Sequence, residues 1–88
     1  YSKLFITIYD NNFVIVDRND KLIKHCSIYL INMAGVFYFL KVFNNNPFDN
    51  NIRIVSVKES DNMSIDTTIE KIQDKIVGRI IYTGIFYN

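Results

Sequence analysis

The sequence predicts an α+β fold, with a short mixed sheet of about three strands packed against helices. Runs of β-branched and aromatic residues separated by polar residues predict strands near the start of the chain. A long apolar run in the middle and isoleucines at helical spacing in the last third predict the helices. With 88 residues and 49% hydrophobic residues, the chain is expected to form one domain over 1–88.

Two predicted strands open the chain. Residues 3–9 have the sequence KLFITIY and residues 13–17 have the sequence FVIVD, both rich in β-branched and aromatic side chains. Asp10, Asn11 and Asn12 lie between them and favour turn geometry. The two runs therefore predict a hairpin. Because almost every position is apolar, the strands are expected to be buried on both faces or to face a partner chain.

The middle of the chain predicts a buried helix or helix pair. Over residues 28–43 only Asn32 and Lys41 are plainly polar, and apolar residues all round a helix indicate burial on most sides. Gly35 is expected to mark a bend or the join of two short helices. A fully buried strand is the competing interpretation for residues 36–43, because periodicity does not separate it from a buried helix.

The last third of the chain predicts a loop, a strand and an amphipathic helix. Residues 44–51 (NNNPFDNN) contain the only proline and predict a loop, and residues 52–57 (IRIVSV) predict a strand. A helix is expected over 67–81, with Thr67 and Glu70 forming a capping box. Isoleucines spaced four, three, four and four residues apart form one stripe of this helix: Ile65, Ile69, Ile72, Ile76 and Ile80.

Charge and cysteine content narrow the functional classes. Ten basic and nine acidic residues give a net charge of +1 and are spread along the chain, so no nucleic-acid partner is expected. The longest uncharged run covers 26–40 and is shorter than the ~20 residues of a membrane span, so no membrane association is expected. A single cysteine forms no internal disulfide, which favours a cytoplasmic or nuclear protein.

His25 and Cys26 are the only adjacent pair with reactive side chains. Neighbouring residues rarely bring a thiolate and an imidazole within hydrogen-bond reach, so the pattern favours a turn histidine and a small buried cysteine over a catalytic dyad. One histidine and one cysteine do not complete a zinc site. We therefore expect no enzyme activity, no catalytic residue, no metal and no cofactor.

The aromatic content points to protein contacts. Six tyrosines and seven phenylalanines are many for so small a chain, and they either form the core or mark a protein-binding surface. Phe48 lies between Pro47 and Asp49 in an otherwise polar loop. It either anchors a partner or folds back onto the core. The predicted partner surface in this loop includes Asn46, Phe48, Asp49 and Asn50.

Several short segments resemble the BTB/POZ superfamily, which includes BTB domains and Elongin C. They are Lys3-Leu4, Asp10 and the Val14–Asp17 run near the start, residues 22–28, residues 52–55, and Ile81-Tyr82-Thr83-Gly84 near the end. The resemblance covers nearly the whole chain. It implies a BTB/POZ-like domain that lacks the C-terminal helices with which the family continues.

The resemblance also implies a function. It predicts a non-enzymatic adaptor for protein–protein interaction, of the kind found in cullin–RING E3 ubiquitin ligases, with a cullin or a substrate receptor as partner. The partner surface would join the loop to the helix that contains Tyr82. The alternative is a structural self-assembly domain, a homodimer or polymer with no ubiquitin role.

Overall fold

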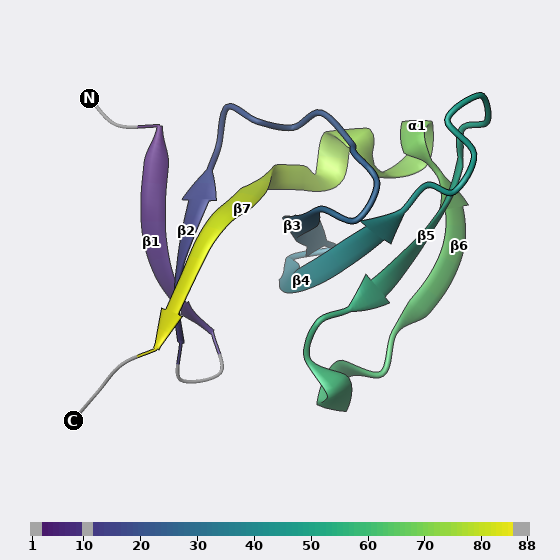
Figure 1. Ribbon diagram of the computed structural model, residues 1–88. Coiled ribbons are helices and arrows are strands. Elements are labelled where there is room, and N and C mark those ends of the chain that lie inside the picture. The colour runs from purple at the N-terminus through teal and green to yellow at the C-terminus, as the bar shows by residue number, and fades with distance from the viewer. Residues whose placement is uncertain (1–2, 10–11, 86–88) are drawn as a thin grey trace.

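The computed structural model describes residues 3–9 and 12–85, apart from the side chains of residues 8, 9, 82 and 85. The strands in these residues form one seven-stranded sheet in the order β1-β2-β7-β3-β4-β5-β6, and every neighbouring pair is antiparallel (Figure 1). The predicted α+β fold with a short mixed sheet is therefore wrong. The elements are β1 (Leu4–Tyr9), β2 (Asn12–Asp17), β3 (Ile28–Met33), β4 (Val36–Phe43), β5 (Asn51–Ser56), η1 (Glu59–Asp61), β6 (Ser64–Thr68), α1 (Ile69–Ile72), η2 (Gln73–Lys75) and β7 (Ile76–Ile85).

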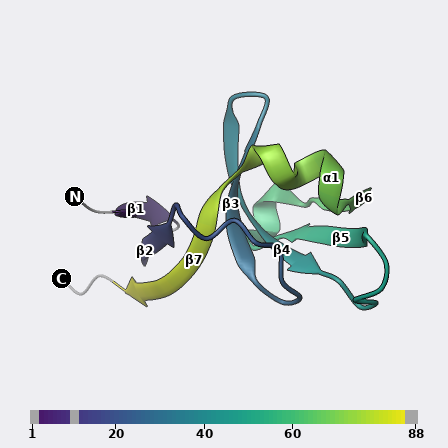
Figure 2. The same ribbon diagram turned by 90° about the horizontal axis from the view of Figure 1, so that it is seen from above.

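The predicted first hairpin is confirmed. Strands β1 and β2 pair from Leu4 with Asp17 to Tyr9 with Asn12. The other side of β2 pairs with β7, the last strand of the described residues, so the first two strands and the last strand lie side by side in one half of the sheet (Figures 1 and 2). The predicted turn residues Asp10 and Asn11 lie outside the described residues.

The helix predicted over 28–43 is wrong, because this segment is the hairpin β3–β4. The competing interpretation of 36–43 as a strand is correct, but the strand is not fully buried, since Val36 and Phe37 are 51% and 58% exposed. Gly35 lies in the turn of the hairpin rather than between helices, and it and Ala34 both have positive φ, 87° and 54°, as tight hairpin turns require. The hairpin packs on both faces, so its apolar residues need not alternate with polar ones.

The helix predicted over 67–81 is also wrong. Its residues divide among the end of β6, one turn of α1, the 3-10 turn η2 and most of β7. Isoleucine is β-branched and therefore favours strands over helices. Thr68, not Thr67, precedes α1 and makes no side-chain capping bond. None of the helices in the described part of the chain is long and apolar enough to cross a membrane.

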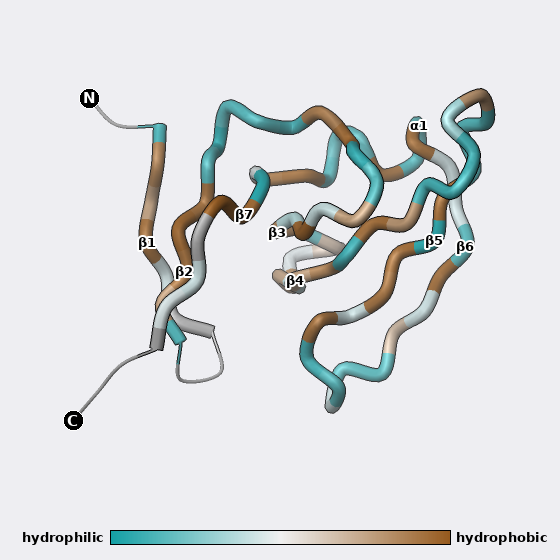
Figure 3. The backbone as a smooth tube through the Cα atoms, viewed as in Figure 1, coloured by the Kyte–Doolittle hydropathy of each residue, from teal (hydrophilic) through white to brown (hydrophobic). Residues whose placement is uncertain are grey.

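Two apolar cores lie on opposite faces of the β3–β4 hairpin. Odd-numbered residues of β3 and even-numbered residues of β4 enter the larger core, and the alternate residues enter the smaller core. Apolar segments accordingly run along both β4 and β7 (Figure 3). The buried residues of the larger core are Ile23, Tyr29, Ile31, Leu40, Val42, Ile52, Ile54, Ile72 and Ile76, and those of the smaller core are Val14, Val16, Leu30 and Phe39.

The isoleucine stripe is buried in part, although it does not form a helix. Ile72 and Ile76 are buried in the larger core, and Ile65 and Ile69 pack against it. Ile80 packs instead against the smaller core, because β7 passes from one core to the other. The spacing therefore identified apolar contact positions correctly and their conformation wrongly.

Candidate functional site

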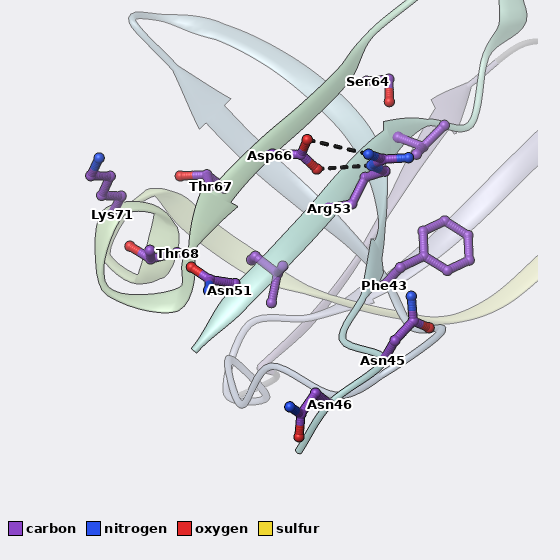
Figure 4. Close-up of a pocket in the computed structure, with 12 residues that line it drawn as sticks. Phe43, Asn45, Asn46, Asn51, Arg53, Ser64, Asp66, Thr67, Thr68 and Lys71 are labelled. Carbon is purple, nitrogen blue, oxygen red and sulfur yellow. Dashed lines mark hydrogen bonds and ion pairs between the residues drawn. The ribbon is translucent and has the colours of Figure 1, made fainter. Parts of the chain in front are cut away.

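A polar hollow of about 950 Å³ lies over β4, β5 and β6 (Figure 4). Its floor is set by strand register, since Phe43 pairs with Arg53 and Arg53 pairs with Asp66 on three neighbouring strands. Lys71 of α1 and Asn46 of the β4–β5 loop line its rim. The hollow thus combines an aromatic ring, amides, hydroxyls and charged groups, which suits hydrogen bonding to a polar ligand or protein surface.

An ion pair fixes the centre of the hollow. The Arg53 guanidinium donates from Nε to Asp66 Oδ1 at 2.8 Å and from Nη2 to Asp66 Oδ2 at 3.2 Å. The hydrogen bonds from Arg53 lower the pKa of the Asp66 carboxyl, and Asp66 in turn raises the pKa of Arg53. Both side chains are exposed, so the pair holds the geometry of this surface more than it stabilises the fold.

The loop predicted over 44–51 is confirmed over 44–50, because Asn51 begins β5, and it is held by its own hydrogen bonds. Asn46 accepts the backbone N–H of Phe48 on Oδ1 at 3.1 Å and the N–H of Asp49 on its carbonyl oxygen at 3.0 Å. The Asp49 carboxylate accepts the backbone N–H of Asn51 at 3.1 Å and its side-chain amide at 3.0 Å. Short polar side chains that bond to nearby backbone groups stabilise a defined turn.

The loop is also attached to α1. Asn50 accepts the N–H of Ile69 at 2.9 Å and donates its side-chain N–H to Glu70 at 2.5 Å. Glu70 was predicted to belong to a capping box, and it holds the loop instead. At the tip Phe48 is 98% exposed, which excludes the alternative that this ring folds back onto the core.

The structure brings together four of the five predicted site residues. Asn46, Phe48, Asp49 and Asn50 share the β4–β5 loop, and Asn46 lines the hollow. Tyr82 does not join them: it lies in β7, paired with Ile15 of β2, at the opposite side of the molecule (Figures 1 and 2). The helix that was expected to place Tyr82 beside the loop is a strand, and the Tyr82 side chain lies outside the described residues.

His25 and Cys26 lie in a turn, as predicted, but Cys26 is exposed rather than buried. The Nδ1 atom of His25 accepts the backbone N–H of Asn44 at 2.9 Å, and its ring packs edge-on against Phe43 at 6.1 Å. The histidine therefore supports the start of the loop. Within the described residues, no three His, Cys, Asp or Glu side chains are grouped to hold a metal ion.

The sequence interpretation missed Phe43, Arg53 and Asp66 as residues of the site. Arg53 has a detectable signal, because it alternates with Ile52 and Ile54 in a strand pattern, which places it on the outer face. Its pairing with Asp66 was hidden, because residues 64–68 were assigned in part to a helix and strand register does not follow from composition.

Strand β6 is an outer strand of the described sheet. The N–H of Ser56 bonds to the Met63 carbonyl at 3.0 Å, and the N–H of Ile69 bonds to the Asn50 carbonyl at 2.9 Å. The odd-numbered residues between these two bonds therefore face β5. Since successive residues alternate, the backbone N–H and C=O groups of Ser64, Asp66 and Thr68 point to the open side.

Comparison of the chain with protein-family models, with curated proteins and with solved structures found no match in any of the three. The BTB/POZ resemblance therefore stays a prediction from short motifs. The helices that the apolar run and the isoleucine spacing predicted over 28–43 and 67–81 are strands for most of their length.

Proposed function

We propose that this protein is a non-enzymatic protein-interaction module that binds a partner through the 44–50 loop and the adjoining polar hollow. The observation that carries the proposal is the Phe48 side chain, which is 98% exposed on a loop held by hydrogen bonds. Large aromatic side chains supply much of the binding energy in protein interfaces. A loop that is already ordered loses less conformational entropy when it binds.

The surroundings of Phe48 support a polar partner surface around an apolar anchor. The hollow offers the Arg53–Asp66 pair, the Lys71 ammonium and the Asn46 amide for hydrogen bonds. The open edge of β6 adds backbone groups at Ser64, Asp66 and Thr68 that an extended partner segment pairs with. An apolar centre with a polar rim is the usual arrangement of a protein interface.

The proposal does not extend to cullin or ubiquitin ligases. That expectation came from the BTB/POZ resemblance, and the partner surface it implied included Tyr82, which lies in a strand across the sheet from the loop. The interaction role itself depends only on the loop and the hollow.

Photo-crosslinking tests the proposed function. A benzophenone amino acid at position 48 should capture a protein that the same probe at Leu22 does not. Leu22 is the matched control because it is also apolar, 66% exposed and in a different loop.

With the captured partner purified, Phe48→Ala should weaken binding by about 2 kcal/mol, or roughly thirtyfold, with unchanged thermal stability. Leu22→Ala should leave both unchanged. Equal affinity of the Phe48→Ala and native proteins would contradict the proposal.

Self-association through β1 is the second candidate function, and the apolar edge of the sheet favours it. Ile6 is 68% exposed on an outer strand. The N–H of Arg18 bonds to the Lys3 carbonyl at 2.9 Å, so the backbone of Ile6 points away from β2. Apolar outer strands are prone to pair with another chain.

Sedimentation equilibrium separates the two candidates. Self-association should appear in the native protein and disappear in Ile6→Lys, while Thr68→Lys on the opposite edge should leave it unchanged. A native protein that stays monomeric at high concentration would remove the second candidate.

A further inference from the structure

A second hollow, of about 510 Å³, lies where the β1–β2 hairpin approaches β3, β4 and β7. Its walls are apolar and mostly aromatic, and they come from four strands that meet around the smaller core. Phe37 is 58% exposed at its mouth, and Phe39 is buried at its base. The apolar lining residues are Phe5, Leu30, Phe37, Phe39 and Val77.

One cation lies at this apolar hollow. The Arg18 guanidinium lines it and stacks over the Phe5 ring, 5.4 Å from the ring centroid. Its neighbouring carboxylates are engaged elsewhere, since Asp17 accepts the N–H of Asn19 and Asp20 is paired with Arg79. Among the described residues no carboxylate forms an ion pair with Arg18. The positive charge therefore remains available to a ligand.

We propose that this second hollow binds a small apolar molecule that carries a single carboxylate. Its volume lies within the range of about 300–1,000 Å³ that is typical of small-molecule sites, and such sites combine an apolar lining with few polar groups. The phenylalanine rings hold the apolar body, and the planar guanidinium of Arg18 receives the carboxylate by paired hydrogen bonds. The Thr7 hydroxyl adds one further polar group. This inference is independent of the loop and of the proposed protein partner.

Two probes of equal shape test the proposal. 2-Naphthoate carries the carboxylate, and 2-naphthamide replaces it with a neutral amide. In a titration followed by backbone amide NMR, naphthoate should shift the signals of Thr7, Leu30 and Val77. It should bind about tenfold more tightly than naphthamide, because a charged hydrogen-bonded pair is stronger than a neutral one.

Variants separate the charge from the apolar walls. Arg18→Gln should reduce naphthoate affinity about tenfold and leave naphthamide affinity unchanged. Arg18→Gln keeps the backbone N–H that bonds to the Lys3 carbonyl, so the hairpin should remain folded. Arg53→Gln, which removes the exposed arginine of the other hollow, is the matched control and should change neither affinity.

A second pair of variants tests the walls. Phe37→Ala should weaken both probes, whereas Val36→Ala should weaken neither, because Val36 is similarly exposed at the start of β4 but points to the opposite face.

Three outcomes would overturn the inference. The first is the absence of shifts at the lining residues with millimolar naphthoate. The second is equal affinity for naphthoate and naphthamide, which would leave only an apolar surface. The third is undiminished naphthoate binding in Arg18→Gln.

Discussion

The two faces of the β3–β4 hairpin differ in how completely they are covered. On one face, β5, α1 and the segment around Ile23 enclose the larger core, whose residues are nearly all fully buried. On the other face, β1, β2 and β7 cover the smaller core and leave the second hollow open beside Leu30 and Phe39. One hairpin therefore packs into an enclosed core on one face and borders an open hollow on the other.

Both hollows lie on the less covered face of β4. Phe37, Phe39 and Phe43 alternate along this strand and so point to the same side. Phe37 and Phe39 line the apolar hollow, and Phe43 lines the polar one. We therefore expect substitutions of hairpin residues in the larger core to lower the free energy of unfolding more than substitutions of hairpin residues on the other face.

Leu40→Ala and Leu30→Ala compare the two faces directly, because both leucines belong to the same hairpin and point to opposite sides. Leu40 is fully enclosed, so its removal leaves a cavity and should lower the free energy of unfolding by about 4 kcal/mol. Leu30 borders a hollow that is already open, so its loss should be about 2 kcal/mol. Urea denaturation of both variants measures the difference, and equal losses would contradict the proposed asymmetry.

Two glycines of β7, Gly78 and Gly84, lie where this strand passes close to residues of β2. A Cβ atom at Gly78 would collide with the backbone carbonyl of Asp17 and contact the Val16 side chain at 2.9 Å, so Gly78→Ala should destabilise the protein by about 3 kcal/mol. At Gly84 the three atoms nearest the added Cβ all belong to the Phe13 ring, a side chain rather than backbone. Gly84→Ala should therefore lower the melting temperature less, and the reverse order would show that β2 moves more easily than the ring.

Prediction from sequence succeeded where one short segment carried a clear signal. It failed where a strand buried on both faces has the same apolar composition as a buried helix. The first hairpin followed from two β-branched runs, and the 44–50 loop followed from its asparagines and Pro47. Residues 28–43 have apolar side chains for both cores, and the same composition is expected of a buried helix.

The helix predicted from the isoleucine stripe, Ile65 to Ile80, is wrong for a related reason. Its members reach the cores from β6, α1 and β7, and the helical spacing arises because the chain changes direction between them. Within the candidate site, the loop residues were found from sequence. Arg53 and Asp66 meet only through strand register, which no short-range signal indicates.

Tyr29→Phe tests how the larger core is closed. The buried hydroxyl of Tyr29 donates to the Leu22 carbonyl at 2.6 Å and accepts the Lys24 N–H at 2.8 Å, and so holds the segment that contains Ile23 over the core. Removing it leaves two backbone groups without a partner and should lower the free energy of unfolding by about 2 kcal/mol. Hydrogen exchange at Lys24 should also accelerate. Unchanged exchange would show that the segment is held by Ile23 packing alone.

Asp20→Asn tests the ion pair that ties the β2–β3 connection to β7. The Arg79 Nε atom donates to Asp20 Oδ2 at 2.6 Å, and this hydrogen bond holds the pKa of the Asp20 carboxyl below its usual range. Because the pKa is lower in the folded protein, the pair stabilises it above the unfolded pKa of about 4 and loses this effect as pH falls further. Asp20→Asn should therefore lower the free energy of unfolding by about 1 kcal/mol at neutral pH and by little in acid.

Denaturation of Asp20→Asn and the native protein across this pH range measures the effect, with Asp66→Asn as the control. Asp66 forms the corresponding pair with Arg53, but its side chain is 74% exposed, so solvent screening should make its substitution the weaker of the two. An Asp20→Asn loss that persists in acid would assign the effect to packing at Arg79 rather than to charge. If Asp66→Asn lowered the free energy of unfolding as much as Asp20→Asn, the exposed Asp66–Arg53 pair on the less covered face would stabilise the fold as much as the Asp20–Arg79 pair.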